Sequence, residues 1–297
     1  MNSLLSIESL ELSFELYKRN LKVLNKINLN VFKGEKIAVV GESGSGKSVM
    51  LRIILGILND KNALIGGKVF FDSIDLRSQK ENYMKNNIRG REISMIFQDP
   101  MASLNPVFTI RDQITNVIKL KNKKLKKNEV EDIAFDQLKK VSINDIGRVL
   151  DSYPFQLSGG MAQRILIIMA LMNNPKIVLA DEPSTALDVT LQKQALNLMN
   201  ELANEIQSAV LLVTHNLGVV REFAERVYVI YRGTIVEEGL VDDIFNNPQH
   251  PYTIALLEAV PRLTGDGLPK FDPNPPEYEK IKKFSHPSLS KYYEKHS

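Results

Sequence analysis

The chain has 297 residues, 43% of them hydrophobic, which is enough for one large domain or two modest ones with an apolar core. Its 38 basic and 35 acidic residues leave a formal charge of +3, a balance that argues against nucleic acid as the main partner. The sequence contains no cysteine, which excludes disulfides and cysteine-held metal or iron–sulfur sites and fits a reducing compartment.

The first forty residues predict strands. Apolar residues recur through residues 5 to 40 at the spacing of strands, with a turn expected at Lys33-Gly34-Glu35. The N-terminus lacks the basic region of a signal peptide, and the longest apolar stretch, Ile165 to Met172, is far shorter than the ~20 residues of a membrane helix. We therefore expect a soluble protein that works at a membrane only by docking on another protein.

Residues 41 to 48 fit the phosphate-binding pattern G-x-x-x-x-G-K-[ST], between an apolar run that predicts a strand and one that predicts a helix. Glycines let backbone N–H groups turn toward a phosphate, and the start of the helix adds a partial positive charge. Lys47 can reach the β- and γ-phosphates, and the Ser48 hydroxyl can ligate Mg²⁺. The alternative is a glycine-rich turn followed by Lys-Ser by chance. The nucleotide-binding residues predicted here are Gly41, Glu42, Ser43, Gly44, Ser45, Gly46, Lys47, Ser48 and Val49.

The next stretch predicts two strands and then a helical segment. Ile65 to Phe71 predicts a turn followed by a strand, and Ile93 to Phe97 predicts a strand that ends at Gln98. The Gln98 amide can ligate Mg²⁺ or orient a water, although a polar residue at a strand end is as often structural. From residue 99 to 160, a loop gives way to apolar residues at helical spacing, which predicts a helical segment.

From residue 161 onward, strands and helices alternate again. Helices are expected at 161–172, 190–206 and 217–225, and strands at 176–181, 209–214, 227–231 and 234–237. This alternation predicts a mostly parallel sheet covered by helices. The prolines between residues 261 and 287 predict an extended tail.

Three further motifs have polar residues at the ends of strands or the starts of helices. The strand over 177–180 leads into Asp181 and Glu182, and ligands meet the carboxyl ends of parallel strands. Asp181 is then placed for Mg²⁺ and Glu182 for a water attacking the γ-phosphate, unless the strand simply leads into a helix cap. His215 ends the next strand and can reach the γ-phosphate, although a lone histidine there is usually structural.

A second anion site is predicted at a helix N-terminus. Its residues are Ser158, Gly159, Gly160 and Met161. The serine and the two glycines leave backbone N–H groups that can accept an anion. An ordinary helix start that contains glycine is the alternative.

In this order, these motifs resemble the nucleotide-binding subunit of ABC transporters over about residues 5 to 262. They match the family's Walker A loop (41–48), Q-loop residue (Gln98), signature (157–161), Walker B strand (177–182), D-loop (184–188) and switch histidine (His215). The resemblance implies an α/β P-loop cassette with a RecA-like, mostly parallel sheet core, an N-terminal antiparallel β part, a helical subdomain and a C-terminal extension. It implies an ATPase domain at 5–245, with a core at 5–98 and 161–245, a helical subdomain at 99–160 and an extension at 246–297.

Finer features are similar to the oligopeptide/dipeptide and nickel importer class. The similarity is carried by residues 41–49, 97–106, Tyr153-Pro154 and 188–190, and residues 247–253 look like that class's C-terminal extension. Met161, where most of the superfamily has glutamine, resembles the D-type member of the two ATPases in these importers. Its partner would be an F-type ATPase, or a second copy of itself. Relatives often carry cysteines after the proline-rich stretch, and their absence here predicts no cluster.

The resemblance also implies a mechanism. Two ATPase subunits would close head to tail, with ATP between the Walker A loop of one and the signature of the other. Phe14 would stack on adenine, with Tyr17 as the alternative. Glu182 would polarise the attacking water, and His215 would contact the γ-phosphate. Ser48, Gln98 and Asp181 would hold Mg²⁺.

Closure would drive two membrane permease subunits, served indirectly by an extracellular substrate-binding protein, from the cytoplasmic face of the cell membrane. The chain would be a peripheral membrane protein there. Asn216 and Ala162 depart from the Asp and Arg common at these positions, without removing a catalytic group.

The first hypothesis is therefore an ATP hydrolase that drives peptide import, and a nickel or other small-solute importer ATPase is the close alternative. A non-transport ABC ATPase would usually fuse two cassettes or insert a coiled coil or zinc module. A P-loop kinase or GTPase would leave Leu157 to Met161 unexplained.

Overall fold

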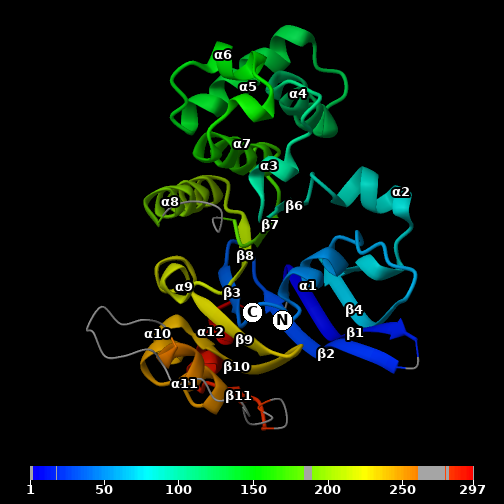
Figure 1. The fold of residues 1–297 in the computed structure, drawn as a ribbon, viewed down its shortest axis with the longest axis vertical. Helices are drawn as coiled ribbons and strands as arrows, with labels where there is room; N and C mark the ends of the chain where they lie inside the picture. Colours follow the sequence, from blue (N-terminus) through cyan, green and yellow to red (C-terminus); the bar gives the residue numbers. More distant parts are fainter. Residues whose placement is uncertain (1–2, 18, 184–188, 260–277, 279–280, 297) are drawn as a thin grey trace. The chain divides into compact units, whose positions relative to one another are not determined.

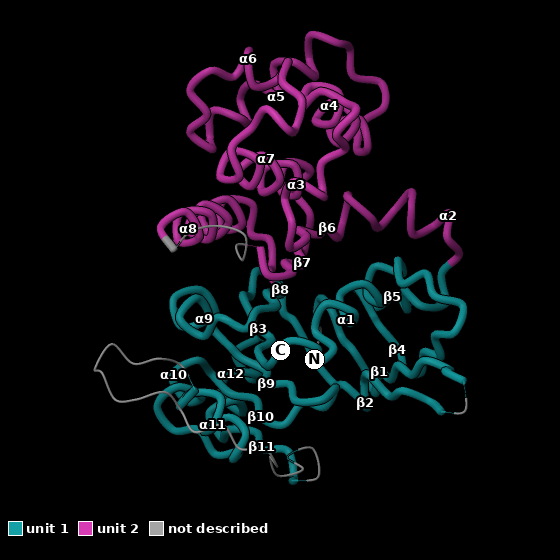
Figure 2. Tube along the Cα trace, viewed as in Figure 1, with its two compact units in different colours: residues 1–79, 211–297 teal, residues 80–210 magenta. Residues whose placement is uncertain are grey.

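The structure, a computed structural model, describes residues 3–17, 19–183, 189–259, 278 and 281–296 (Figure 1). The chain forms two compact units, which Figure 2 colours separately. Unit 1 comprises Met1–Gln79 and Leu211–Ser297, and unit 2 comprises Lys80–Val210. Over the described ranges, no helix is long and apolar enough to cross a membrane.

Unit 1 begins with an antiparallel sheet in the strand order β2-β1-β4-β5. Alternate residues of β1 enter the core, and the alternation changes phase at a register irregularity between Ile7 and Leu10. β1 and β2 are the antiparallel strands expected ahead of the phosphate loop, whereas β4 and β5 follow the loop in the chain. The strands of this sheet are β1 (Leu5–Leu16), β2 (Arg19–Val31), β4 (Ala63–Phe71) and β5 (Ile74–Asp75).

The turn expected at the start of residues 65–71 is wrong, because β4 already begins at Ala63. Gly66 and Gly67 lie within this strand, beside the irregular part of β1. Gly67 has a φ of +79°, and a Cβ there would lie 2.3 Å from the backbone oxygen of Ser9. The two glycines therefore mark a close approach between two backbones, not a reversal of the chain.

The second sheet of unit 1 has the order β11-β10-β9-β3-β8, where β8 contributes residues 211–214 to this unit. β3 pairs in parallel with β9, and β10 pairs antiparallel with β9. Nearly every residue of β3, β8 and β9 is buried, as in strands covered on both faces. The strands are β3 (Lys36–Val40), β8 (Ala209–Thr214), β9 (Arg226–Tyr231), β10 (Thr234–Leu240) and β11 (Phe284–Ser285).

Helices from the C-terminal part of unit 1 share a core with the strand that leads to the phosphate loop. One apolar cluster joins Val40 of β3 to Val229 of β9, Ile244 of α10 and Tyr252 of α11. The C-terminal extension is thus packed on the same sheet as the loop. The helices of unit 1 are α1 (Lys47–Ile54), η1 (Leu76–Ser78), α9 (Leu217–Phe223), α10 (Val241–Asn246), α11 (Pro251–Glu258) and α12 (Ser288–His296).

Unit 2 combines a parallel strand pair with the helices expected between residues 99 and 160. β6 (Ile93–Ile96) pairs in parallel with β7 (Ile177–Asp181). α4 and α5 bury one apolar face, α7 is buried on most sides, and a capping box of Thr109 with Asp112 starts α4. The helices are α2 (Glu81–Tyr83), η2 (Met84–Ile88), α3 (Pro100–Ser103), α4 (Ile110–Lys121), α5 (Lys127–Lys140), α6 (Ile146–Asp151), η3 (Pro154–Gln156), α7 (Gly159–Leu171) and α8 (Val189–Glu205).

The prediction of an extended tail over residues 261–287 lies mostly outside the described residues. Residues 260–277, where most of its prolines lie, fall outside the described residues. β11 and α12 follow, and α12 was not predicted. Leu289, Tyr292, Tyr293 and His296 of α12 recur at helical spacing, and Tyr292 and Tyr293 pack against Phe32.

Candidate functional site

The phosphate loop lies in unit 1 between β3 and α1. Lys47 begins α1, and only 4% of its surface is exposed. Its Nζ donates to the backbone oxygens of Gly41, at 2.8 Å, and Glu42, at 2.9 Å. The ammonium is therefore held over the loop by the loop's own carbonyl oxygens, where it can meet a phosphate.

Two glycines of the loop are required for different physical reasons. A Cβ on Gly41 would lie 2.1 Å from the backbone oxygen of Ile230, at the end of β9. Gly46, the residue before α1, has a φ of +99°, and a Cβ there would lie 2.6 Å from a side-chain carbon of Leu24. The loop thus packs tightly against both sheets of unit 1, so its backbone has little room to shift.

The start of α1 can receive an anion. Gly46 supplies no side-chain cap, and the first turn holds no acidic residue, so no negative side chain of this turn opposes an anion near the positive end of the helix dipole. Ser48 and Val49 in this turn are half-buried, and Ser43 and Gly44 of the loop are exposed. The position of these groups at the start of a helix is what the predicted anion site requires, and the site itself stays a prediction.

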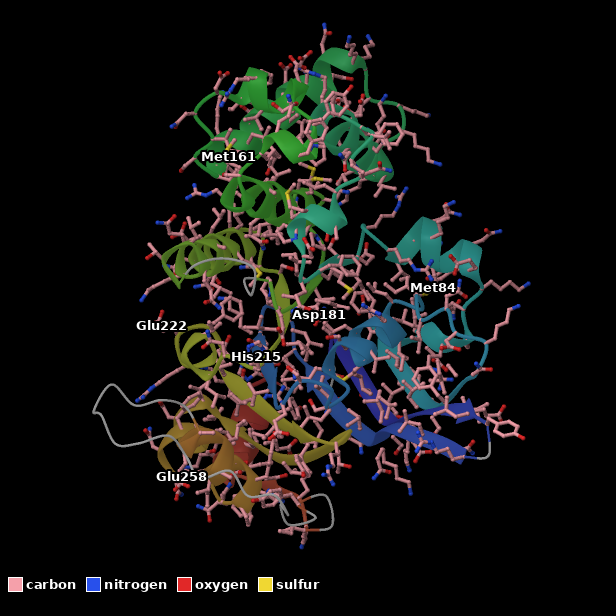
Figure 3. The ribbon with its side chains drawn as sticks, in the orientation of Figure 1. Met84, Met161, Asp181, His215, Glu222 and Glu258 are labelled. Carbon is pink, nitrogen blue, oxygen red and sulfur yellow. The ribbon has the colours of Figure 1, made fainter. Side chains whose placement is uncertain are left out.

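The remaining candidates of unit 1 lie at different depths. His215 directly follows β8 and is exposed (Figure 3). The next residue, Asn216, caps α9 by accepting from the N–H groups of Gly218 and Val219, which an aspartate would do equally well. Phe14 is half-buried on β1, whereas the side chain of Tyr17 is highly exposed.

Unit 2 carries the predicted acidic pair. Asp181 is the last residue of β7 and is buried (Figure 3), and Glu182 follows with 9% of its surface exposed. Glu182 has a φ of +45°, which is uncommon for a residue other than glycine and often marks a functional position. Gln98 donates from Nε2 to Oε2 of Glu182 at 3.3 Å. The structure therefore brings together two predicted residues that are far apart in the chain.

The signature residues begin α7 in unit 2. Ser158 caps the helix by accepting from the N–H of Met161 at 3.3 Å, and Met161 lies in the first turn of α7 (Figure 3). Gly159 and Gly160 are the first residues of α7. These residues line a cavity of about 620 Å³, whose other walls include Arg148, Arg164 and Leu191. A phosphate-bearing ligand can approach the signature there.

The structure gives no geometry for two of the predicted features, the D-loop and the Mg²⁺ site. The D-loop, residues 184–188, lies outside the described residues. The described residues also hold no cluster of three or more His, Asp or Glu side chains that could bind a metal. Mg²⁺ usually takes only one or two carboxylates and completes its shell with water and substrate phosphates. That Ser48, Gln98 and Asp181 bind Mg²⁺ stays a prediction.

One contact to the phosphate loop was missed by sequence reasoning. The hydroxyl of Tyr252, in the extension, accepts a hydrogen bond from the backbone N–H of Glu42 at 3.1 Å. In the sequence, the motif around Tyr252 indicates only the class of protein to which the chain is similar. No local pattern signals a contact across 210 residues of chain.

Two parts of the chain match known protein families. Residues 24–185 match the family model described as ABC transporter, and residues 236–291 match the oligopeptide/dipeptide transporter C-terminal region. The oligopeptide transport ATP-binding protein AppD of Bacillus subtilis (strain 168) is 44% identical over 268 residues, which cover 90% of this chain and 81% of AppD. The dipeptide transport ATP-binding protein DppD of the same organism is 44% identical over 280 residues, covering 93% of this chain and 83% of DppD.

A solved structure is similar in fold. It is a dimeric ATP-binding cassette in a post-hydrolysis state bound to ADP and Pi. The TM-score is 0.71 at 29% identity, and the match covers 80% of this chain and 98% of that one.

Proposed function

The chain belongs to the ABC transporter family, and we propose that it is the ATP-binding subunit of an importer that takes up peptides. The similarity to a solved ATP-binding cassette confirms the predicted α/β cassette fold, and the chain is an ATPase of this family. The observation that carries the peptide assignment is the C-terminal match at residues 236–291 to the oligopeptide/dipeptide transporter region. AppD and DppD, both named as peptide transport proteins, support it.

The site residues have separate roles in this proposal. The N–H groups of residues 43–48 and the ammonium of Lys47 bind the β- and γ-phosphates of ATP. Ser48, Asp181 and Gln98 hold Mg²⁺, which neutralises charge on the phosphate oxygens when it is bound.

Hydrolysis depends on a further set of side chains. Glu182 polarises the attacking water as general base, and its bond from Gln98 keeps the carboxylate oriented. His215 donates to the γ-phosphate. Positioning and electrostatic stabilisation supply most of the reduction in the barrier, as in phosphoryl transfer generally.

Adenine recognition and dimer formation complete the site. Phe14, or Tyr17 in its place, stacks on adenine. Ser158, Gly159, Gly160 and Met161 meet the ATP that is held by another ATPase subunit. That subunit is an F-type ATPase or a second copy of this chain, joined head to tail.

Membrane subunits are the further partners that we propose. Large apolar side chains are exposed in two segments of unit 2, and they are Phe97, Met101, Val107, Phe108, Tyr153 and Phe155. Tyr153 and Phe155 also stack, with ring centroids 5.7 Å apart. Exposed apolar groups of this kind suit a protein partner. Docking on two permease subunits would hold the chain at the cytoplasmic face of the cell membrane as a peripheral protein, and an extracellular binding protein would deliver substrate.

The test is transport by the assembled complex. The chain is co-expressed with an F-type ATPase and two candidate permease subunits, purified and reconstituted into vesicles with ATP inside. ATP-dependent uptake of a labelled peptide in the presence of its binding protein is the expected result. Uptake of Ni²⁺ without peptide uptake would favour the nickel importer alternative. Co-purification with nucleic acid or ribosomes in place of membrane proteins would contradict the transport assignment.

A further inference from the structure

Tyr252 connects the C-terminal extension to the phosphate loop. Its hydroxyl accepts a hydrogen bond from the backbone N–H of Glu42, the second residue of the loop, at 3.1 Å. Tyr252 is only 2% exposed, so the acceptor side of this bond is buried, whereas the donor residue Glu42 is exposed. Burial raises the pKa of the hydroxyl, which therefore stays neutral near pH 7.

The ring of Tyr252 is fixed by neighbouring rings. Its centroid lies 4.4 Å from that of Tyr231 and 5.6 Å from that of Tyr278. Tyr231 is the last residue of β9, and the residue before it, Ile230, approaches Gly41 of the loop. The same strand end therefore supports both the tyrosine ring and the beginning of the loop.

The backbone of Tyr252 is fixed by a buried polar network. His250 caps α11, and its Nδ1 accepts from the N–H of Tyr252 at 3.2 Å. The fully buried carboxylate of Glu237 on β10 accepts from the N–H of Gln249 at 2.9 Å, the N–H of His250 at 3.0 Å and Nε2 of His286 at 2.8 Å. Because Glu237, His250 and His286 are buried, a displacement would leave their donors or acceptors unpaired. The position of the hydroxyl is therefore set by the sheet.

Glu42 is held from two sides. Its N–H is bound by Tyr252, and its carbonyl oxygen accepts from Nζ of Lys47 at 2.9 Å. When Lys47 turns to a phosphate, its bond to Glu42 is weakened or lost, whereas the bond that the Glu42 N–H donates to Tyr252 does not depend on Lys47. Tyr252 can thus keep the loop in shape at the moment when the loop must accept the nucleotide.

We propose that Tyr252 is a positioning residue for nucleotide binding, and that the segment His250-Pro251-Tyr252 holds the phosphate loop in its binding shape. The proposal rests on the proposed ATP binding at residues 41–48. In this proposal the C-terminal extension supports the nucleotide site of its own chain, in addition to indicating the class of transporter. Tyr252 contacts the backbone of the loop and is not itself a catalytic residue.

The test compares Tyr252→Phe with Tyr278→Phe in the full chain. Both variants lose one hydroxyl from the same aromatic cluster, but of these two hydroxyls it is that of Tyr252 that accepts from the backbone N–H of Glu42. The dissociation constants of Mg-ATP and Mg-ADP are measured by calorimetry. Tyr252→Phe should weaken both nucleotides by the same factor, about two- to tenfold, which is what one net hydrogen bond is worth. Tyr278→Phe should bind both as the wild type does.

A second readout separates positioning from general destabilisation. With an F-type partner present, Tyr252→Phe should raise KM for ATP by a similar factor while kcat at saturating ATP stays within about twofold of the wild-type value. If the wild type binds ATP and Tyr252→Phe binds it equally well, the positioning role is overturned and the ATPase assignment stands. An equal loss of affinity in both variants would also overturn it, since the effect would then come from the aromatic cluster. If the wild type itself fails to bind either nucleotide, the proposed function fails first.

Discussion

The two units place their polar groups differently. In unit 1, Arg226 and Glu35 form an ion pair whose side chains are both fully buried, and the phosphate loop is packed against two sheets. In unit 2, the ion pair of Arg148 with Asp145 is mostly exposed, and Gln98 reaches Glu182 from an exposed position. Groups fixed by burial cannot move without a large penalty, whereas exposed groups can exchange partners with water or another protein. Nucleotide binding should therefore depend on packing in unit 1, and turnover on single side chains in unit 2.

The largest effect on stability should come from the buried pair of unit 1. Arg226→Ala leaves the Glu35 carboxylate buried without its main partner, which should cost about 3–5 kcal/mol in the free energy of unfolding. Arg148→Ala removes one member of the exposed pair in unit 2 and should cost about 0–1 kcal/mol. Urea denaturation measures both. Equal losses in the two variants would break the distinction between the units.

The next effect should come from the close packing of the loop. Gly41→Ala places a Cβ against the backbone oxygen of Ile230, and relieving that clash should cost about 1–3 kcal/mol and distort the site. We expect ATP affinity to fall by about tenfold or more. Gly147→Ala is the matched control, because a Cβ there meets no atom within 4 Å, and it should leave ATP binding unchanged. Wild-type affinity in Gly41→Ala would show that the loop tolerates a shift of its backbone.

A more selective effect is expected in unit 2. Gln98→Ala removes the amide that donates to the Glu182 carboxylate, and a bond of this exposed kind is worth about a tenfold change in rate. Turnover with an F-type partner should fall by at least that factor, while the affinity for ATP measured without Mg²⁺ stays the same, since Gln98 is also a proposed Mg²⁺ ligand. A loss of ATP affinity with unchanged kcat would place Gln98 in the binding step, and would contradict the division of roles between the units.

The smallest effect concerns acid stability in unit 1. Burial lowers the pKa of His250 below its ordinary value of 6.5, against the opposing pull of Glu237. The unfolded chain then takes up a proton before the folded one does, so the stability that His250 contributes is complete above about pH 6.5 and is lost as the pH falls. Unfolding by urea at pH 7.5 and 5.5 should show a smaller loss in His250→Asn, whose side chain can still cap α11. An identical loss in both proteins would mean that other groups set the acid dependence.

The sequence predicted those parts of the site that lie within one motif. The loop at 41–48, the acidic pair Asp181 and Glu182, and the helix start at Ser158 each follow from a local pattern, and the structure places them on the expected elements. Contacts between distant residues could not be predicted in this way. Residues 65–67 were expected to turn because glycine is common in turns, whereas here it allows two backbones to approach.

The C-terminal part shows the same limit. α12 was missed because the prolines before it suggested an extended tail, although its aromatic spacing is helical. The bond from Glu42 to Tyr252 joins two ends of the chain, and only the packing of the extension on β9 and β10 brings it about. Local patterns therefore identified the chemistry, and the folded structure was needed to show what supports it.

The central claim is that this chain binds ATP in unit 1 and hydrolyses it with Glu182 of unit 2 when a second ATPase subunit supplies its signature. The most direct test is ATP turnover by the chain alone, with an F-type partner, and with the partner and Glu182→Gln. We predict little turnover alone and a clear rise with the partner. Loss of the general base should then lower the rate by about 10²–10⁴-fold while ATP still binds. Full activity of the isolated chain as a monomer, or partner-dependent turnover that survives Glu182→Gln, would contradict this account.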